Sequence, residues 1–206
     1  MQSRKPKPPL MTPYANRRAR KYLYEREVIY MTVVARETGR YGHRDATMIW
    51  MMYRHGLRVS EVRALTWKQI NFDQCRIYVK RSKNGLSTTQ LLAAHELGAL
   101  ILLRPKNAKP TDAVFLSSRG GSMSHATVYK MIARAGRNAE IDFPVNPHAL
   151  RHACGFHLTN VRKADTRRVQ EYLGHKDIRH TVRYTELDDS KFEGLWEDEG
   201  KPPVAV

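Results

Sequence analysis

The chain has 206 residues, of which 41% are hydrophobic and 27% charged, a size and balance that predict one main domain with a buried core. Its longest apolar runs are far too short to span a bilayer, and its N-terminus lacks the apolar segment of a secretory signal. We therefore exclude a transmembrane protein and expect a cytoplasmic one. Cys75 and Cys154 are isolated, so we expect them to fill apolar space and form no disulfide.

Basic residues dominate the charge: 36 Lys and Arg stand against 20 Asp and Glu, for a formal net charge of +16. Such an excess attracts polyanions through counterion release, which makes nucleic acid the leading partner. A membrane surface or an acidic protein would fit the same total. The charge is uneven, because residues 1–44 carry 11 basic and 3 acidic groups whereas residues 186–206 carry 2 and 7. The acidic last segment is not expected to lie on DNA.

The first half of the chain predicts three helices and a hairpin. A helix over residues 16–37 should end at Gly39, and a strongly apolar one over 45–55 at Gly56, while Ser60 looks like the N-cap of a short third helix. Residues 76–80 alternate with β-branched and aromatic side chains, and 87–92 can return as the partner strand after the turn signal Asn84-Gly85.

The second half is mainly helical. The pattern predicts a helix over 94–103, a short strand over 113–116, and a helix over 124–139 whose apolar stripe faces the core. Further helices are predicted over 147–160 with Pro147 first, from Asp165 or Thr166 to a cap at Gly174, over 178–184 and over 188–196. The whole predicts a mainly helical α+β domain with one small antiparallel three-stranded sheet.

Three short segments carry side chains suited to binding an anion. In Asn146-Pro-His-Ala-Leu-Arg-His152, His148 and Arg151 fall at i, i+3 and point the same way from one helix. The segment from Leu173 to Thr185 places His175 just after a glycine turn and Tyr184 nine residues later, with a basic run between them. Arg58 lies in a turn between two apolar helices, where a guanidinium has little structural reason to be.

In their order and spacing, these segments resemble the motifs of the tyrosine recombinase (phage integrase) family, and the short chain is similar to its fimbrial phase-variation invertases. The resemblance covers about residues 45 to 196 and implies a site-specific DNA recombinase that needs no metal and no cofactor. It implies that Arg58 and Arg151 bind the phosphate, Lys83 on the hairpin protonates the leaving oxygen, His148 and His175 are the two histidines, Tyr184 is the nucleophile, and Glu61 is the accessory carboxylate.

The physical chemistry of phosphodiester cleavage fits these side chains. Two planar guanidinium groups can bind the non-bridging oxygens bidentately and stabilise the charge that builds on them, as a metal ion would. A tyrosine with a pKa near 10 needs a cationic pocket and a proton acceptor such as His148 to become a nucleophile. The phosphotyrosyl bond keeps the energy of the broken phosphodiester, so a 5′-hydroxyl from another strand can reseal it.

Several assignments have alternatives. Lys80 and Arg81 lie close to Lys83 and compete for its role, and Lys83 is preferred because it directly precedes Asn84-Gly85. His148 and His152 form an HxxxH spacing that could bind zinc, but no third ligand is arranged around them. We expect His152 to hydrogen-bond buried backbone and His180 to support the Tyr184 helix.

The resemblance also implies partners and a division of the chain. We expect a disordered basic, Pro-rich arm over residues 1–14, a basic helix over 15–44, the catalytic domain over 45–186 and an acidic tail over 187–206 that contacts other protomers. Longer relatives carry a separate N-terminal domain that closes around DNA, and we expect the arm and basic helix to replace it in part. The expected DNA-binding residues are Arg4, Lys5, Arg17, Arg18, Arg20, Arg81 and Arg179.

The expected substrate is double-stranded DNA with inverted-repeat sites, bound by a homotetramer with a possible DNA-bending accessory protein and without a membrane, at the nucleoid. Two alternatives remain: a non-catalytic sequence-specific DNA-binding regulator on the same fold, and a type IB topoisomerase-like enzyme that relaxes one duplex. The target sequence cannot be read from the chain, because it depends on side chains that meet base edges in the grooves.

Overall fold

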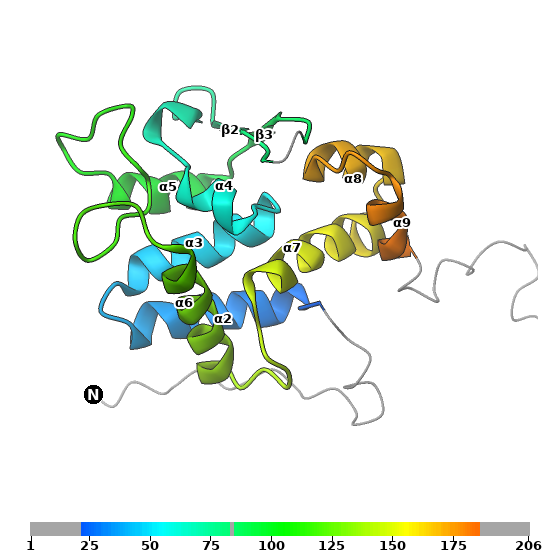
Figure 1. Cartoon of the computed structure of the whole chain (residues 1–206), viewed down its shortest axis with the longest axis horizontal. Coiled ribbons are helices and arrows are strands. Elements are labelled where there is room, and N and C mark those ends of the chain that lie inside the picture. Colours follow the sequence, from blue (N-terminus) through cyan, green and yellow to red (C-terminus); the bar gives the residue numbers. More distant parts are fainter. Residues whose placement is uncertain (1–21, 83–84, 186–206) are drawn as a thin grey trace, which may run out of the picture.

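The computed structural model describes residues 22–82 and 85–185, which form a set of packed helices with a small sheet on one side (Figure 1). The arm predicted over residues 1–14, the hairpin residue Lys83 and the helix predicted over 188–196 lie outside the described residues. No helix in the part of the chain that is described is long and apolar enough to cross a membrane.

Helices α2 (Glu25–Thr38) and α3 (Gly42–Arg54) form a tightly packed pair at the base of the core. Val28, Met31 and Ala35 recur at helical spacing on α2 and are buried, because an apolar stripe with this period is removed from water only against another element. α2 therefore shares one core with α3 across the boundary predicted at residue 44.

A short helix α4 (Val59–Arg63) follows the turn at Gly56, whose φ of +56° is the left-handed conformation expected there. The prediction that Ser60 is its N-cap is wrong, because Arg58 occupies that position. The Glu61 carboxylate accepts a hydrogen bond from the backbone N–H of Arg58, at 2.9 Å, and so starts the helix earlier. A 3₁₀ turn, η1 (Trp67–Gln69), leads into the sheet.

The predicted three-stranded antiparallel sheet is present, with the strand order β1 (Ile70–Asn71), β2 (Arg76–Val79) and β3 (Thr88–Leu91). The strands β2 and β3 form the predicted hairpin, whereas β1 was not predicted. Pairing sets Ile77 opposite Gln90, and both face inward with Val79. The strand predicted over 113–116 is not formed: this segment makes only single bridges, from Ala113 to Thr66 and from Leu116 to Ser122. Its buried Val114 and Phe115 explain the apolar signal without a ladder of hydrogen bonds.

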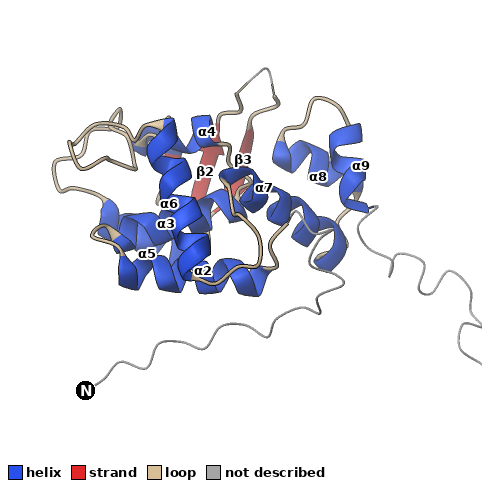
Figure 2. Cartoon of the chain, turned by 60° about the horizontal axis from the view of Figure 1, so that its bottom comes forward, coloured by secondary structure: helices blue, strands red, loops and turns tan. Residues whose placement is uncertain are grey.

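The remaining helices pack around the core. They are α5 (Ala94–Leu103), α6 (His125–Asn138), α7 (Pro147–Phe156) with its π-helical extension η2 (His157–Val161), α8 (Thr166–Leu173) and α9 (Arg179–Thr185). Ser124, Asn146 and Asp165 cap α6, α7 and α8 through their side chains, and Gly174 ends α8 at φ +64°. Figure 2 shows the strands β2 and β3 between α4 and the pair α8–α9, and α9 packs on α7.

Candidate active site

Arg58 and Glu61 form the outer edge of the site at the start of α4. The Arg58 side chain is 26% exposed and donates from Nη1 to Glu61 Oε1 at 2.7 Å. Burial opposes ionisation of Glu61, but the charge of Arg81 and then hydrogen bonds from Arg58 outweigh it and lower the pKa of Glu61 to about 2. A carboxylate that is ionised at all ordinary pH values holds Arg58 in place and leaves its other donors for an anion.

Arg151 is buried inside the fold and is only 1% exposed. It sits on the first turns of α7, and its guanidinium donates to the carbonyl oxygens of Gly56 and Leu173. Burial and the neighbouring arginines lower its pKa to about 10, so it keeps its charge at neutral pH. A guanidinium has five N–H donors, and the two carbonyls use only part of them.

His175 is buried directly after the αL turn of Gly174. Its Nδ1 lies 2.8 Å from the hydroxyl of Thr181 on α9. Burial and then the charge of Arg151 lower its pKa to about 3, so the imidazole is neutral at pH 7. It can hydrogen-bond a substrate oxygen without adding charge.

His148 and His152 stand one turn apart on α7, with ring centroids 4.3 Å apart. His148 is exposed, and partial desolvation and the nearby arginines lower its pKa. His152 makes a contact that the sequence did not predict: its Nδ1 lies 3.2 Å from the hydroxyl of Tyr184. The sequence feature that could have indicated this contact is the i, i+4 spacing of His148 and His152, which puts both on the same face of the helix.

Tyr184 closes the site from α9 and is 2% exposed. Its ring is nearly parallel to that of His175, with centroids 6.4 Å apart, and packs on Gly155 of α7. Burial raises its pKa to about 12, opposed by the charge of Arg151. The hydroxyl is therefore protonated at neutral pH and needs a base and a bound phosphate to react.

The structure thus brings Arg58, Glu61, Arg151 and three histidines around Tyr184 of the same chain. His180 lies on α9 with its ring 5.9 Å from that of His175. Lys83 and the predicted DNA-binding residues Arg4, Lys5, Arg17, Arg18 and Arg20 lie outside the described residues. Arg179 is fully solvated and pairs with Asp177 at 2.6 Å, which leaves it accessible to DNA.

The expectation that Arg81 contacts DNA is wrong. Its side chain is buried, and it donates to the Glu61 carboxylate and to three backbone carbonyls. A basic residue beside a hairpin turn is usually solvated, but the inward alternation of β2 carries this one under the site.

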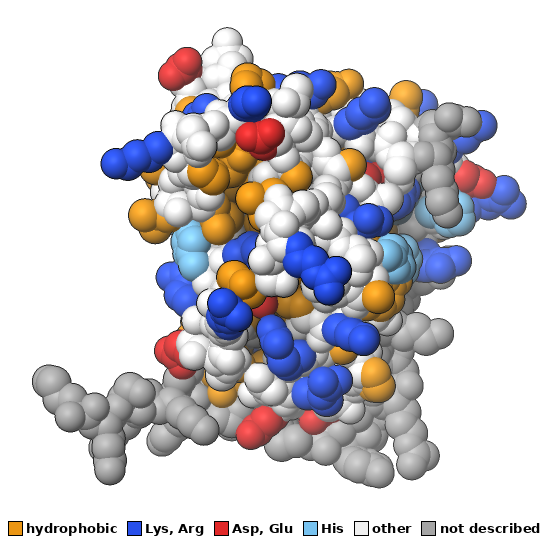
Figure 3. All heavy atoms as spheres, turned by 60° about the vertical axis from the view of Figure 1, so that its left-hand side comes forward, with side chains coloured by type: hydrophobic (Ala, Val, Ile, Leu, Met, Phe, Trp, Pro, Cys, Tyr) orange, Lys and Arg blue, Asp and Glu red, His pale blue; other side chains and the backbone are white. Residues whose placement is uncertain are grey.

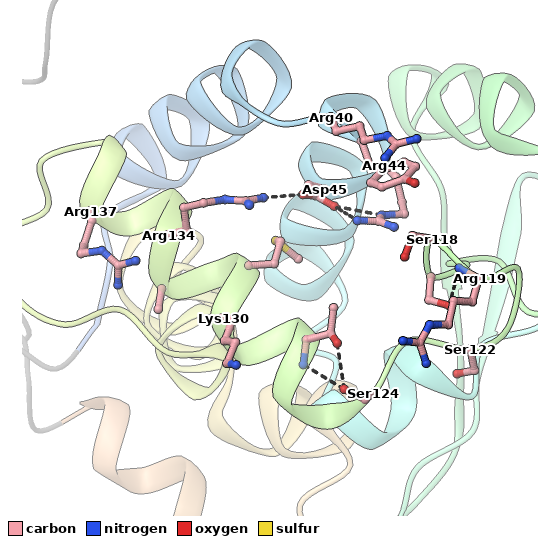
Figure 4. A pocket seen from close by; sticks show the side chains of 15 residues that line it. Arg40, Arg44, Asp45, Ser118, Arg119, Ser122, Ser124, Lys130, Arg134 and Arg137 are labelled. Carbon is pink, nitrogen blue, oxygen red and sulfur yellow. Dashed lines mark hydrogen bonds and ion pairs between the residues drawn. The ribbon is translucent and has the colours of Figure 1, made fainter.

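A second basic region surrounds a cavity of about 960 Å³ between α6, the α2–α3 turn and the loop before α6. Lys and Arg side chains outnumber acidic ones on the face shown in Figure 3. In Figure 4, Arg44 and Arg134 point toward Asp45, and each forms an ion pair with it, at 2.6 and 3.1 Å. The other basic residues that line the cavity are Arg40, Arg119, Lys130 and Arg137.

Among the described residues, no group of three His, Cys, Asp or Glu side chains is arranged to hold a metal ion. Arg58 and Arg151 supply cationic charge at the site, and both lower the pKa of His175. Such preorganised donors stabilise charge that develops on phosphate oxygens.

This fold, with a tyrosine held among two arginines and three histidines, defines the catalytic domain of a tyrosine recombinase. The sequence profile of the phage integrase family matches residues 21–191, so the chain belongs to that family. It is 43% identical to the "Type 1 fimbriae regulatory protein FimE" of Escherichia coli (strain K12), over 86% of this chain and 91% of the relative.

Two further similarities concern longer proteins. The chain is 38% identical to "Tyrosine recombinase XerD" of Pseudomonas putida, over 75% of this chain and 53% of the relative. The crystal structure of XerA recombinase superposes with a TM-score of 0.69 and 28% identity, over 82% of this chain and 61% of that one. The chain therefore spans a little over half of these longer recombinases, and the fold prediction made from the sequence is confirmed.

Proposed function

We propose that this tyrosine recombinase cuts and rejoins double-stranded DNA between two matched sites, through a 3′-phosphotyrosyl bond to Tyr184. The observation that carries the proposal is the position of Tyr184. Its hydroxyl contacts His152 of the same chain, and its ring lies nearly parallel to that of His175. Burial raises its pKa, and the charge of Arg151 opposes that rise. A tyrosine that only packed in the core would not need two histidines and a buried arginine around it.

The reaction begins when Arg58 and Arg151 bind the non-bridging oxygens of the scissile phosphate. Negative charge builds on these oxygens during the attack. The two guanidinium groups therefore stabilise the transition state more than the ground state. The Tyr184 oxygen attacks phosphorus, its proton leaves toward the His152 and His148 pair, and the 5′-oxygen departs with a proton that we assign to Lys83.

The covalent product retains the phosphoester bond energy, so no ATP is consumed. A 5′-hydroxyl from a second duplex attacks the phosphotyrosine, forms a new phosphodiester and returns Tyr184 to its free state. In this proposal the side chains of the protein supply the phosphate-binding, proton-transfer and nucleophilic groups of each step.

DNA binding is supported by the net charge of +16 and by the basic cavity beside α6. Lys and Arg side chains that neutralise phosphates release counterions and supply most of the sequence-independent affinity. We propose that four protomers act on two synapsed sites, that the acidic segment 187–206 contacts a neighbouring protomer, and that a DNA-bending protein assists. We further propose that the protein acts in the cytoplasm at the nucleoid, where its DNA substrate would be.

The similarity to a fimbriae regulatory protein favours inversion of a segment between short inverted repeats. The word "regulatory" would also fit a DNA-binding protein without catalysis, and one-site relaxation by a topoisomerase would use the same nucleophile. These three functions differ in what they require: only the recombinase needs two matched sites, and only the regulator survives the loss of the Tyr184 hydroxyl.

The test uses the DNA that flanks the gene, cloned as a supercoiled plasmid with one or two candidate repeats. We expect inversion with two repeats, and a covalent protein–DNA complex on a nicked duplex that traps the cleaved strand. Tyr184→Phe should abolish both, whereas Tyr129→Phe, on the exposed side of α6, should retain them. Inversion by Tyr184→Phe would overturn the assignment of the nucleophile.

A further inference from the structure

We propose that Arg81 is a positioning residue that sets the phosphate-binding geometry of Arg58, in the reaction proposed above, on which this inference rests. Arg81 follows β2 and points into the protein with 5% exposure. It is a charged side chain without access to DNA, so any effect on catalysis must pass through the groups that it contacts.

Two nitrogen atoms of Arg81 connect three elements of the site. Nη1 donates to Glu61 Oε2 at 2.9 Å and to the carbonyl of Gly56 at 3.1 Å. Nη2 donates to the carbonyl of His55 at 3.0 Å and to that of Tyr172 at 2.6 Å. The planar fork of an arginine can satisfy such divergent acceptors at once, and the single ammonium of a lysine cannot.

The path from Arg81 to Arg58 runs through the Glu61 carboxylate. Glu61 Oε2 accepts from Arg81 and from the backbone of Arg58, and Oε1 accepts from Arg58 Nη1 and the backbone of Ser82. The Glu61 side chain is 2% exposed. Loss of Arg81 would leave this buried anion with too little positive charge, and the carboxylate would then draw Arg58 toward itself and away from the phosphate.

Arg81 also keeps the two halves of the site in register. The carbonyl of Gly56 accepts from both Arg81 and Arg151. At the end of α8, the successive carbonyls of Tyr172 and Leu173 accept from Arg81 and Arg151 respectively, directly before Gly174 and His175. The two buried guanidinium groups thus fasten the Arg58 turn to the His175 turn.

A substrate with altered charge separates positioning from general stability. A methylphosphonate replaces one non-bridging oxygen by a methyl group and removes the negative charge that Arg58 is assigned to stabilise. We would measure the single-turnover rate of covalent complex formation on nicked duplexes with a phosphodiester or with each methylphosphonate stereoisomer at the cleavage site. The variants are Arg58→Ala, Arg81→Gln, Arg81→Lys and, as a control, Arg63→Gln on the same helix α4.

We expect Arg81→Gln to cleave the phosphodiester about tenfold or more slowly than the native protein. We expect one methylphosphonate stereoisomer to restore cleavage by Arg58→Ala. On that stereoisomer, Arg81→Gln should cleave within about threefold of the native rate. Arg81→Lys should fall between, because it keeps the charge but not the fork. Arg63 donates to the carbonyl of Met123 and is half-buried, so its loss should slow both substrates equally or not at all.

Equal loss on both substrates, or a native rate on the phosphodiester, would overturn the role of Arg81. Should Arg81→Gln fail to give a cooperative thermal transition, the same comparison with Arg81→Lys decides. No covalent complex with the native protein would instead overturn the proposed function, a result that the Arg81 variants alone cannot produce.

Discussion

At the scale of single residues, burial and neighbouring charge set the chemistry of each group in the site. Tyr184 and His175 are both buried, and burial opposes the charged form of each, so the pKa of the tyrosine rises to about 12 and that of the histidine falls to about 3. The positive charge of Arg151 lowers the pKa of both groups, because a cation favours a phenolate and disfavours an imidazolium. The free site is therefore held with neutral acid–base groups around fixed cations.

Gly155 provides the space that the Tyr184 ring occupies. A Cβ atom at this position would overlap the ring, whereas the α-helical backbone of α7 would accept alanine. We expect Gly155→Ala to displace Tyr184, the proposed nucleophile, and to lower the rate of covalent complex formation by about tenfold or more, since a small misplacement of reacting atoms is costly.

Gly136→Ala is the matched control for that substitution, because its Cβ would meet Val145 in the core at 2.6 Å, away from the nucleophile. Both variants should lose stability in urea unfolding, and only Gly155→Ala should lose cleavage beyond what its folded fraction explains. Equal cleavage by the two variants would contradict the assigned role of Gly155.

The lowered pKa of His175 predicts how stability depends on pH. Below pH 6.5 the unfolded chain takes up a proton at this histidine and the folded protein does not, so the free energy of unfolding falls as pH is lowered toward about 3. The slope from this group is at most about 1.4 kcal/mol per pH unit. His148 contributes with the same sign, and Glu61, with its pKa near 2, loses its contribution only below about pH 4.5.

Urea unfolding at about pH 7 and about pH 5 checks this prediction. His175→Asn should show a smaller fall in stability between the two pH values than the native chain. His125→Asn, which removes an exposed histidine from α6, should fall as the native chain does. Parallel curves for the native and His175→Asn proteins would contradict the assignment.

At the scale of elements, α6 has two distinct faces. Val128, Met131, Ile132 and Ala135 are buried, and the opposite face presents basic side chains to the cavity shown in Figure 4. Asp45 at the cavity wall is already neutralised by Arg44 and Arg134, so the exposed Lys130 and Arg137 are left to meet phosphates.

We expect the double substitution Lys130→Ala and Arg137→Ala to weaken DNA binding and to reduce the slope of log K against log salt by about 2. Lys106→Ala with Lys109→Ala removes the same charge from the loop after α5, outside this cavity, and should leave the slope near its native value. Titration of labelled duplex at several salt concentrations measures both. Identical slopes for the two double variants would remove the cavity from the DNA-binding surface.

At the scale of the whole molecule, a basic domain is followed by an acidic segment, residues 186–206, with two basic and seven acidic groups. Leu187, Phe192, Leu195 and Trp196 give that segment apolar side chains as well. Opposite charge on the domain and the segment favours contact between protomers rather than contact with DNA.

We expect Trp196→Ala to abolish synapsis of two sites while one-site binding stays within about twofold of native, because an aromatic anchor carries a large share of interface energy. Gel shifts with one and two sites measure the two steps. Tyr78→Phe, an exposed aromatic change on β2, should leave both steps unchanged. Normal synapsis by Trp196→Ala would contradict assembly through this segment.

The sequence by itself determined the local elements and the motif residues. Ser124, Pro147, Asp165 and Gly174 mark helix ends through short-range chemistry that holds in any tertiary context, and each stands where it was expected. The spacing of His148, Arg151 and His152 on one helix likewise follows from helical geometry. The resemblance to a known family then supplied the functional reading of these residues.

Only the tertiary structure decided which side chains are buried together. The position of Arg81 beside a hairpin turn predicts a solvated side chain. Its hydrogen-bond acceptors instead lie on Gly56, Glu61 and Tyr172, far away in the sequence. His152 likewise contacts Tyr184, which lies 32 positions later in the chain, and residues 113–116 form single bridges to Thr66 and Ser122 instead of a strand. Local patterns specify backbone conformation, whereas the partner of a buried polar group depends on how distant elements pack, and no local pattern contains that information.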